Sequence, residues 1–219
     1  MAGELDAIRI ETGPQPRAAV IWLHGLGADG ADFEPIVPEL RLPAQPAVRF
    51  VFPHAPVRAV TINNGMRMRA WYDILQLGGG PEDEAGLRAS QSLVEELIEK
   101  EKGRKIVLAG FSQGGAIALQ TALRYPERLA GVLALSTYLP LAASLEKERS
   151  EANRDVPIFM AHGQYDDVIP LARAQQSKET LARLGYRIEW QTYPMPHSVC
   201  AQEIADIGRF LAKPLGSSP

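Results

Sequence analysis

The sequence predicts an α/β fold in which a mainly parallel central sheet is covered by helices on both faces. Three observations predict it. Short apolar runs without a helical period, typical of buried strands, recur along the chain. Segments with one apolar face at helical spacing separate most of these runs. This alternation continues over most of the length, as in sheets whose parallel strands are connected by helices.

The strands are expected where short apolar runs end at glycine, proline or polar residues. Residues 5–11 alternate between apolar and polar side chains, which is typical of an edge strand. A hairpin is expected around Asn64-Gly65, because Asn-Gly tolerates the positive φ angles that tight turns require. The expected strands of the main sheet are 5–11, 18–23, 48–52, 106–109, 131–136, 156–161 and 187–193.

The helices are expected between these strands. The longest, 82–102, has Leu87, Val94, Leu97 and Ile98 on one face and charged side chains on the other. Others are expected from Gly114 onward, over 171–184 and over 199–211, whereas 214–219 are expected to be frayed. No repeat or linker divides the 219 residues, so we expect one domain, residues 1–219.

Composition excludes several classes of function. A net charge of −3 without a basic cluster argues against nucleic acid binding. Hydrophobic residues make up 46% of the chain, but no apolar run is long enough to cross a bilayer, so stable membrane insertion is not expected. No signal peptide is visible in residues 1–10, and the single Cys200 has no intrachain partner. Both features favour a cytoplasmic location.

The sequence Gly110-Phe111-Ser112-Gln113-Gly114 lies between an expected strand and an expected helix. It fits the G-x-S-x-G nucleophile elbow, which presents a serine on a sharp turn. The strand and the helix come close together there, so the residues two before and two after the serine must lack a Cβ atom. The alternative is a glycine-rich junction with an incidental serine.

The loop after the strand 18–23 contains Gly25, Gly27 and Gly30, which match G-x-G-x-x-G, the dinucleotide-binding fingerprint. Two observations argue against nucleotide binding. Pro35 and Pro38 interrupt the helix that would receive a pyrophosphate. No carboxylate follows about 20 residues later, where one would bind the ribose. The other interpretation is that this His-Gly loop supplies a backbone N–H to an oxyanion hole.

A serine mechanism requires a base and an acid on neighbouring loops at the carboxyl edge of the sheet. Asp166 or Asp167 follows the strand 156–161, and His197 follows the last strand. The order serine, acid, histidine is the order of α/β-hydrolases. His24 and His162 lie beside glycines at strand ends, where we expect them to fix loops. The residues themselves leave the choice between the two aspartates open.

Five motifs together resemble the phospholipase/carboxylesterase family of α/β-hydrolases, which includes bacterial carboxylesterases and acyl-protein thioesterases. The resemblance extends from about residue 20 to residue 210. It rests on HGLGADG, GFSQGG, GVLALSTYLP, HGQYDDVIP and MPHSV, which occur in the family's order.

The resemblance implies a triad of Ser112, Asp166 and His197, and an oxyanion hole formed by the backbone N–H groups of Leu26 and Gln113. Asp167 stands where the family usually has proline or another residue, and we expect this second carboxylate to alter local pKa values. The family needs no cofactor or metal, and the sequence contains no H-E-x-x-H motif or Cys/His cluster. Because the family often forms homodimers, a homodimer is a further expectation.

About 20 residues separate Ser136 from Val156, too few for a large cap domain, so we expect an open cleft. Trp71, Leu75, Tyr138 and Leu139 are candidate contacts for the acyl group of a small-molecule ester. The alternative for residues 71–77 is ordinary core followed by a loop. The leading hypothesis is a carboxylesterase acting on small to medium-chain esters. The alternatives are an acyl-protein or acyl-CoA thioesterase, a lysophospholipase with the same triad, and a non-catalytic binding protein.

Overall fold

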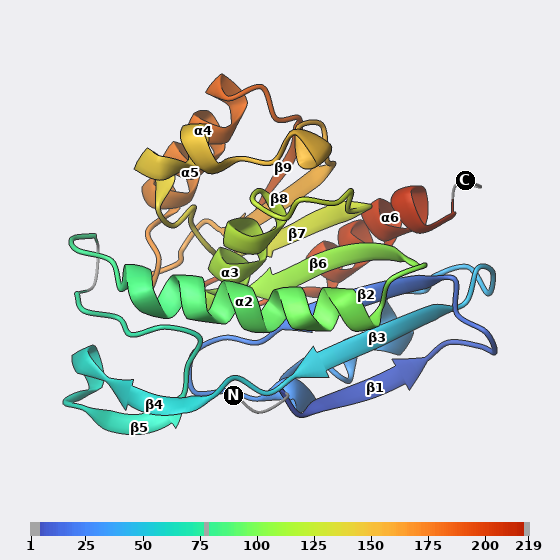
Figure 1. Cartoon of the computed structure of the whole chain (residues 1–219), viewed down its shortest axis with the longest axis horizontal. Coiled ribbons are helices and arrows are strands. Elements are labelled where there is room, and N and C mark those ends of the chain that lie inside the picture. Colours follow the sequence, from blue (N-terminus) through green and yellow to red (C-terminus); the bar gives the residue numbers. More distant parts are fainter. Residues whose placement is uncertain (1–4, 77–78, 217–219) are drawn as a thin grey trace.

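The computed structural model describes residues 5–76 and 79–216 (Figure 1). Within them, a seven-stranded sheet has the order β1-β3-β2-β6-β7-β8-β9. Only β1 is antiparallel to its neighbour, β3, and the remaining pairs are parallel. This confirms the mainly parallel sheet of an α/β-hydrolase. A separate two-stranded sheet, β4-β5, is the hairpin expected around Asn64-Gly65.

The observed strands match the expected apolar runs, with ends that shift by one or two residues in most cases. Their bounds are β1 Ala7–Glu11, β2 Ala18–Leu23, β3 Val48–Pro53, β4 Val57–Val60, β5 Met66–Arg69, β6 Lys105–Phe111, β7 Gly131–Leu135, β8 Ile158–Gly163 and β9 Ile188–Tyr193. The helices are α1 Ile36–Glu39, α2 Glu84–Lys100, α3 Gln113–Ala122, α4 Ala142–Glu148, α5 Leu171–Arg183 and α6 Ala201–Gly216.

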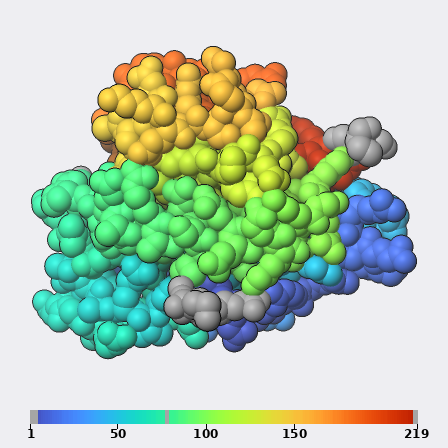
Figure 2. Space-filling view, viewed as in Figure 1, coloured from blue at the N-terminus to red at the C-terminus, as the bar shows by residue number. Residues whose placement is uncertain are grey.

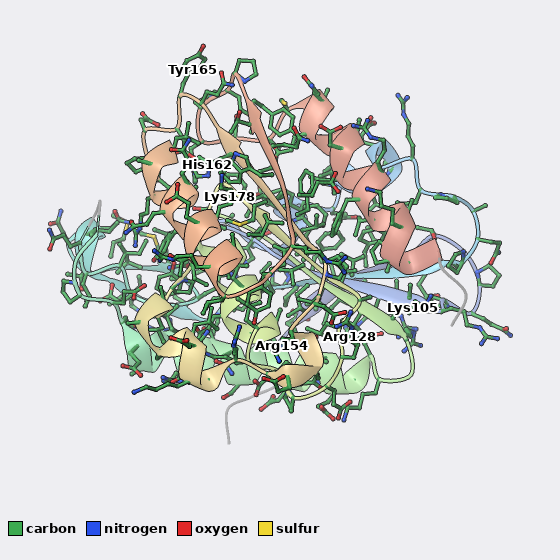
Figure 3. All side chains as sticks on the ribbon, turned by 90° about the horizontal axis from the view of Figure 1, so that it is seen from above. Lys105, Arg128, Arg154, His162, Tyr165 and Lys178 are labelled. Carbon is green, nitrogen blue, oxygen red and sulfur yellow. The ribbon has the colours of Figure 1, made fainter. Side chains whose placement is uncertain are left out.

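Each face of the sheet packs against its own layer of helices. Leu87, Ile117 and Leu181, from α2, α3 and α5, belong to one buried cluster. Ile207 and Phe210 of α6 belong to the cluster on the opposite face. Figure 3 shows α2 and α6 on opposite sides of the sheet. Because interior parallel strands are covered on both faces, every residue of β2, AAVIWL, is buried.

Three helices differ from the sequence expectation, and one of them is the four-residue α1, which was not predicted in a segment that contains Pro35 and Pro38. α6 continues to Gly216 through Pro214, so the expectation that the chain frays from residue 214 was wrong there; residues 217–219 lie outside the described part. Leu215, which is 3% exposed, packs into the core and holds this last turn. α4 was not predicted. It lies beside α2 on the surface shown in Figure 2, and the Arg88–Glu148 ion pair at 2.7 Å connects the two helices.

The parallel strands bring four loops to one edge of the sheet. β2, β6, β8 and β9 all point their carboxyl ends toward this edge, which is where ligands bind in open α/β sheets. These are the loops that contain the candidate catalytic residues. None of the helices within residues 5–76 and 79–216 has the length and apolar character needed to cross a membrane.

Candidate active site

Ser112 lies on a sharp turn between β6 and α3. A Cβ atom on Gly110 would overlap the backbone of Gly114, and one on Gly114 would overlap the backbone of Leu23 at the end of β2. This confirms the reason given above for Gly110, whereas Gly114 must lack a Cβ atom because it approaches the neighbouring strand β2. The turn also forces Ser112 to a φ of 55°, which is strained for a residue with a side chain.

Three hydrogen bonds hold this strained turn in place. The backbone N–H of Ser112 donates to the carbonyl of Leu135 at 2.8 Å, which extends the pairing between β6 and β7. The Ser112 carbonyl accepts from the Thr137 hydroxyl at 2.7 Å and from the Ala116 N–H at 3.1 Å. The nucleophile is therefore fixed by its neighbours on both sides before any substrate binds.

The structure brings the three triad candidates together. His197 Nε2 lies 2.9 Å from Ser112 Oγ, and His197 Nδ1 lies 2.7 Å from Asp166 Oδ2. A carboxylate only accepts hydrogen bonds, so the partner assigns the imidazole proton to Nδ1. Nε2 is then free to accept the serine proton. The ring of Phe111 packs against that of His197, with centroids 4.8 Å apart, and limits its rotation.

Asp166, rather than Asp167, contacts His197. Its other oxygen, Oδ1, accepts from the backbone N–H groups of Val168 at 3.0 Å and Ile169 at 2.8 Å. The Asp166 side chain is completely buried, whereas Asp167 is exposed and forms none of the triad's hydrogen bonds. Burial and these donors fix the carboxylate in the orientation that His197 needs.

His162 and His24 fix loops, as expected. His162 Nε2 lies 2.8 Å from the Ile169 carbonyl and 3.3 Å from Asp166 Oδ2, so it closes the loop that contains the acid. In Figure 3 His162 lies inside this loop, whereas Tyr165 projects outward. Burial is the main cause that lowers the pKa of both His162 and His24, which therefore stay neutral at neutral pH.

Leu26 and Gln113 both line the cavity that contains Ser112. The backbone N–H of neither residue donates to an acceptor within the described residues. Two free N–H groups beside a nucleophile form the arrangement that stabilises an oxyanion.

The Gln113 side chain has a separate structural role. Its Oε1 accepts from the Trp71 N–H at 2.7 Å, and its Nε2 donates to the Tyr72 carbonyl at 2.7 Å. The first residue of α3 therefore fastens the segment that forms one wall of the cavity. No local pattern in the sequence indicates this contact, because Gln113 and Tyr72 are 41 positions apart.

A cavity of about 110 Å³ opens beside Ser112. Two of its apolar lining residues, Leu75 and Val168, are also 40% and 49% exposed, so they flank an open mouth. Its apolar and aromatic lining residues are Leu26, Ile62, Tyr72, Ile74, Leu75, Tyr138, Val168 and Ile169. A mostly apolar cavity next to a nucleophile suits an acyl chain.

Of the four candidate acyl contacts, Leu75 and Tyr138 line this cavity, whereas Trp71 and Leu139 do not. Trp71 is fully buried behind the wall, where its indole N–H donates to the His24 carbonyl at 2.9 Å. The structure thus corrects the expected contact of Trp71: its two N–H groups are committed to protein acceptors. Leu139 is 5% exposed and packs in the core; it lines a neighbouring pocket that shares Tyr138 and Arg173 with this cavity.

Sequence reasoning missed Arg173 as a residue of the cavity. The Tyr72 and Tyr138 hydroxyls lie 3.0 Å apart, and the Arg173 guanidinium lies 3.4 Å from the centre of the Tyr138 ring. Tyr72 belongs to the segment 71–77 that was expected to line a groove, and it lines the cavity. Arg173 is on α5 and had no local signal. Within the described residues, no group of three or more His, Cys, Asp or Glu side chains could hold a metal ion.

Comparison with known proteins agrees with this geometry. The family model described as Phospholipase/Carboxylesterase matches residues 6–215. The chain belongs to the phospholipase/carboxylesterase family. It is a serine hydrolase of the ester-hydrolysing type.

Relatives within the family cover nearly the whole chain. Acyl-protein thioesterase 1 of Mycosarcoma maydis is 40% identical over 94% of this chain and 95% of its own. Acyl-protein thioesterase 1 of Gibberella zeae is 37% identical, over 98% and 97%. Among solved structures, Zea mays acyl-protein thioesterase 2 is 28% identical, with a TM-score of 0.88 over 96% of this chain and 99% of its own. Arabidopsis thaliana SOBER1 is 31% identical, with a TM-score of 0.86 over 91% and 99%.

Proposed function

We propose that this chain is an acyl thioesterase that removes acyl groups from cysteine side chains of proteins. One observation carries the proposal: a serine, a histidine and an aspartate within hydrogen-bond distance, in a chain 40% identical over almost its full length to a protein named acyl-protein thioesterase 1. We also propose a cytoplasmic location, where cysteine thiols stay reduced and S-acylated proteins are its substrates.

In the acylation step, His197 Nε2 takes the proton of Ser112 as Oγ attacks the thioester carbonyl. Asp166 keeps the imidazole proton on Nδ1 and stabilises the imidazolium that forms. The N–H groups of Leu26 and Gln113 bind the oxyanion of the tetrahedral intermediate, and each donor contributes roughly 3 to 4 kcal/mol in the transition state.

The intermediate collapses when the carbon–sulfur bond breaks and His197 returns the proton to the leaving thiolate. An acyl-enzyme on Ser112 remains. Water then attacks this ester with His197 as the base, and the proton returns to Ser112 as the carboxylic acid leaves. A cysteine thiol has a pKa of about 8.5, far below that of an alcohol, so the thiolate leaves more readily than an alkoxide.

A second candidate function is hydrolysis of small to medium-chain oxygen esters. The cavity beside Ser112, about 110 Å³, favours it, because pockets that enclose larger ligands are typically about 300 to 1,000 Å³. Under the thioesterase proposal, a longer acyl chain extends past Leu75 and Val168 at the open mouth, where both side chains are partly exposed.

The deciding experiment compares a thioester and an oxygen ester with the same octanoyl group. Each kcat/KM is divided by the rate of the same substrate with hydroxide, which removes the difference in intrinsic reactivity. A normalised thioester preference of about tenfold or more supports the thioesterase, since it represents about 1.4 kcal/mol of selective transition-state binding. A normalised preference of the same size for the oxygen ester would favour the carboxylesterase instead.

The control for both substrates is Ser112→Ala. We expect kcat to fall by about 10⁶-fold with the fold intact, because the nucleophile is lost. Mass spectrometry after incubation with a fluorophosphonate should show one adduct on the native chain and none on the variant. Substantial activity in pure Ser112→Ala protein would contradict the whole mechanism.

A further inference from the structure

His24, at the end of the buried strand β2, engages both nitrogens of its imidazole. Its Nε2 lies 3.0 Å from the backbone nitrogen of Ala55, and its Nδ1 lies 2.7 Å from the carbonyl oxygen of Gly25. The Ala55 N–H can only donate and the Gly25 carbonyl can only accept. The partners therefore assign the proton to Nδ1, with Nε2 as the acceptor.

The contact with Gly25 determines the direction of a second group. The Gly25 carbonyl and the Leu26 N–H belong to one planar trans peptide unit, so they point in opposite directions. A hydrogen bond that holds the carbonyl toward His24 therefore aims the Leu26 N–H away from it. Leu26 borders the cavity that contains Ser112, and its N–H has no acceptor within the described residues.

This peptide unit needs to be held. Glycine at position 25 has no Cβ atom to restrict its backbone torsions, so the peptide can rotate more easily than one that follows another residue. One neighbouring contact acts on another group, because the Gly27 N–H donates to the Arg69 carbonyl at 2.9 Å. The Ala28 N–H donates to the Gly25 carbonyl as well, but at a longer 3.3 Å. The His24 bond is thus the shortest one that acts on the Gly25 carbonyl.

We infer that His24 is a positioning residue for the oxyanion hole, whose Nδ1–H holds the Gly25–Leu26 peptide with the Leu26 N–H directed at the developing oxyanion. The inference rests on the proposed function, since it assumes that Leu26 is an oxyanion donor. His24 does not exchange protons with the substrate, because it is 1% exposed and both ring nitrogens have partners. Burial, which lowers its pKa, keeps the ring in the neutral form that this geometry requires.

Two substitutions at His24 separate the effects of the two hydrogen bonds that its ring forms. In His24→Asn the amide nitrogen takes the place of Nδ1 and can donate to Gly25, but nothing accepts from Ala55. In His24→Gln the amide oxygen takes the place of Nε2 and can accept from Ala55, but the donor to Gly25 is lost. Both variants remove the ring, so they leave comparable space beside Trp71, whose ring centroid lies 5.5 Å from that of His24.

We expect His24→Gln to lower kcat by about 10- to 100-fold with KM within about twofold, because the oxyanion contact strengthens only in the transition state. We expect His24→Asn to retain kcat within about threefold of the native enzyme while lowering Tm, because the buried Ala55 N–H loses its acceptor. Equal losses of kcat, a larger loss in the Asn variant, or a change in KM alone would overturn the inference.

Fluorophosphonate labelling of the native chain distinguishes the two possible failures. If the native enzyme is labelled on Ser112 and the variants do not differ, the inference fails and the proposed function stands. If the native enzyme is not labelled, the proposed function fails, and the inference, which depends on it, fails as well.

A measurement on the native enzyme keeps the test decisive if a variant does not fold. The ¹⁵N chemical shifts and couplings of labelled histidines report the tautomer of each ring. A proton on Nδ1 of His24 at pH 7 is the expected result. A proton on Nε2, or an imidazolium, would overturn the inference.

Discussion

The catalytic serine lies between two differently built regions, a base side and an oxyanion side. Each contains a histidine with partners on both ring nitrogens. On the base side, His197 contacts a carboxylate and the serine hydroxyl, and its side chain is 15% exposed to the cleft. On the oxyanion side, the ring nitrogens of His24 form hydrogen bonds only with backbone groups, and His24 is 1% exposed.

The difference shows what separates a histidine that moves protons from one that holds a loop. A carboxylate partner stabilises the positive imidazolium that forms during catalysis. Backbone partners and burial favour the neutral ring, which lowers the pKa of His24. The base side therefore changes charge during each cycle, whereas the oxyanion side keeps a fixed geometry that receives charge.

Asp166→Asn should break the base side most completely. Asp166 Oδ1 accepts from two backbone N–H groups, so the amide oxygen of the variant should remain there. The amide NH₂ then faces His197 Nδ1 and forces its proton onto Nε2, where it cannot accept from Ser112. We expect kcat to fall by about 10⁴-fold, measured on a p-nitrophenyl ester.

The matched control for this substitution is Asp167→Asn, at the neighbouring exposed carboxylate. It should leave kcat within about twofold, since surface substitutions away from structural features have small effects. If Asp166→Asn kept more than a few per cent of the native kcat while folded, the assigned tautomer of His197 would be wrong.

More of the base side than of the oxyanion side could be predicted from the sequence, and the reason is physical. Strand and helix periods are local, so the sheet and the elbow at Ser112 could be predicted from short segments. Asp166 and Asp167 are adjacent on one loop, and spacing alone could not separate them. Only the family resemblance favoured Asp166, and the structure has Asp166 against His197.

The contacts of Trp71 show why the other side was harder to predict. An aromatic residue beside a glycine run suggested a groove, but its N–H groups bind Gln113 and His24, which are distant in sequence. Such contacts leave no periodic pattern. Arg173, which stacks on Tyr138, was missed for the same reason.

Gln113→Met should weaken the oxyanion side without removing its backbone donor. The Trp71 N–H and the Tyr72 carbonyl lose their partners in a buried region. Each unpaired group costs about 1 to 3 kcal/mol, so we expect unfolding in urea to show a loss of about 2 to 6 kcal/mol. Because the residue 113 N–H remains, kcat should fall only by about tenfold, far less than in Asp166→Asn.

Gln176→Met is the control, since Gln176 is exposed on α5. Its free energy of unfolding should stay within about 0.5 kcal/mol of the native value. A Gln113→Met enzyme as stable as this control would show that the side chain does not hold the cavity wall.

Glu203 provides a comparison with Asp166, because it is a second buried carboxyl group. It lies in the first turn of α6, the helix that follows His197. It is fully buried, and neither carboxyl oxygen has a hydrogen-bond partner within the described residues. Burial is the main cause that raises the pKa of Glu203 to about 8; Asp206 adds to the rise, and the nearby Cys200 backbone offsets part of it. With a pKa of about 8, Glu203 is mostly protonated at pH 7. Its carboxyl lacks the donors that Asp166 has on both oxygens.

The sign of the pH effect follows from proton binding. Between pH 4.5, the ordinary pKa of a glutamate, and about 8, the folded state retains a proton that the unfolded state releases. Stability from this group is therefore complete below pH 4.5 and declines as pH rises toward 8, by at most about 1.4 kcal/mol per pH unit. Glu203→Gln, which cannot ionise, should remove this decline.

Urea unfolding at pH 5 and pH 8 measures the effect. We expect Glu203→Gln to gain stability relative to the native chain between these two values, by a few kcal/mol at most, with kcat at pH 7 nearly unchanged. Glu179→Gln, at an exposed acid on α5, should show no such gain. A parallel pH dependence in the native chain and Glu203→Gln would mean that Glu203 is already ionised in the folded enzyme. The enzyme would then tolerate an ionised buried carboxylate without hydrogen-bond donors, in contrast to His24, whose pKa burial lowers.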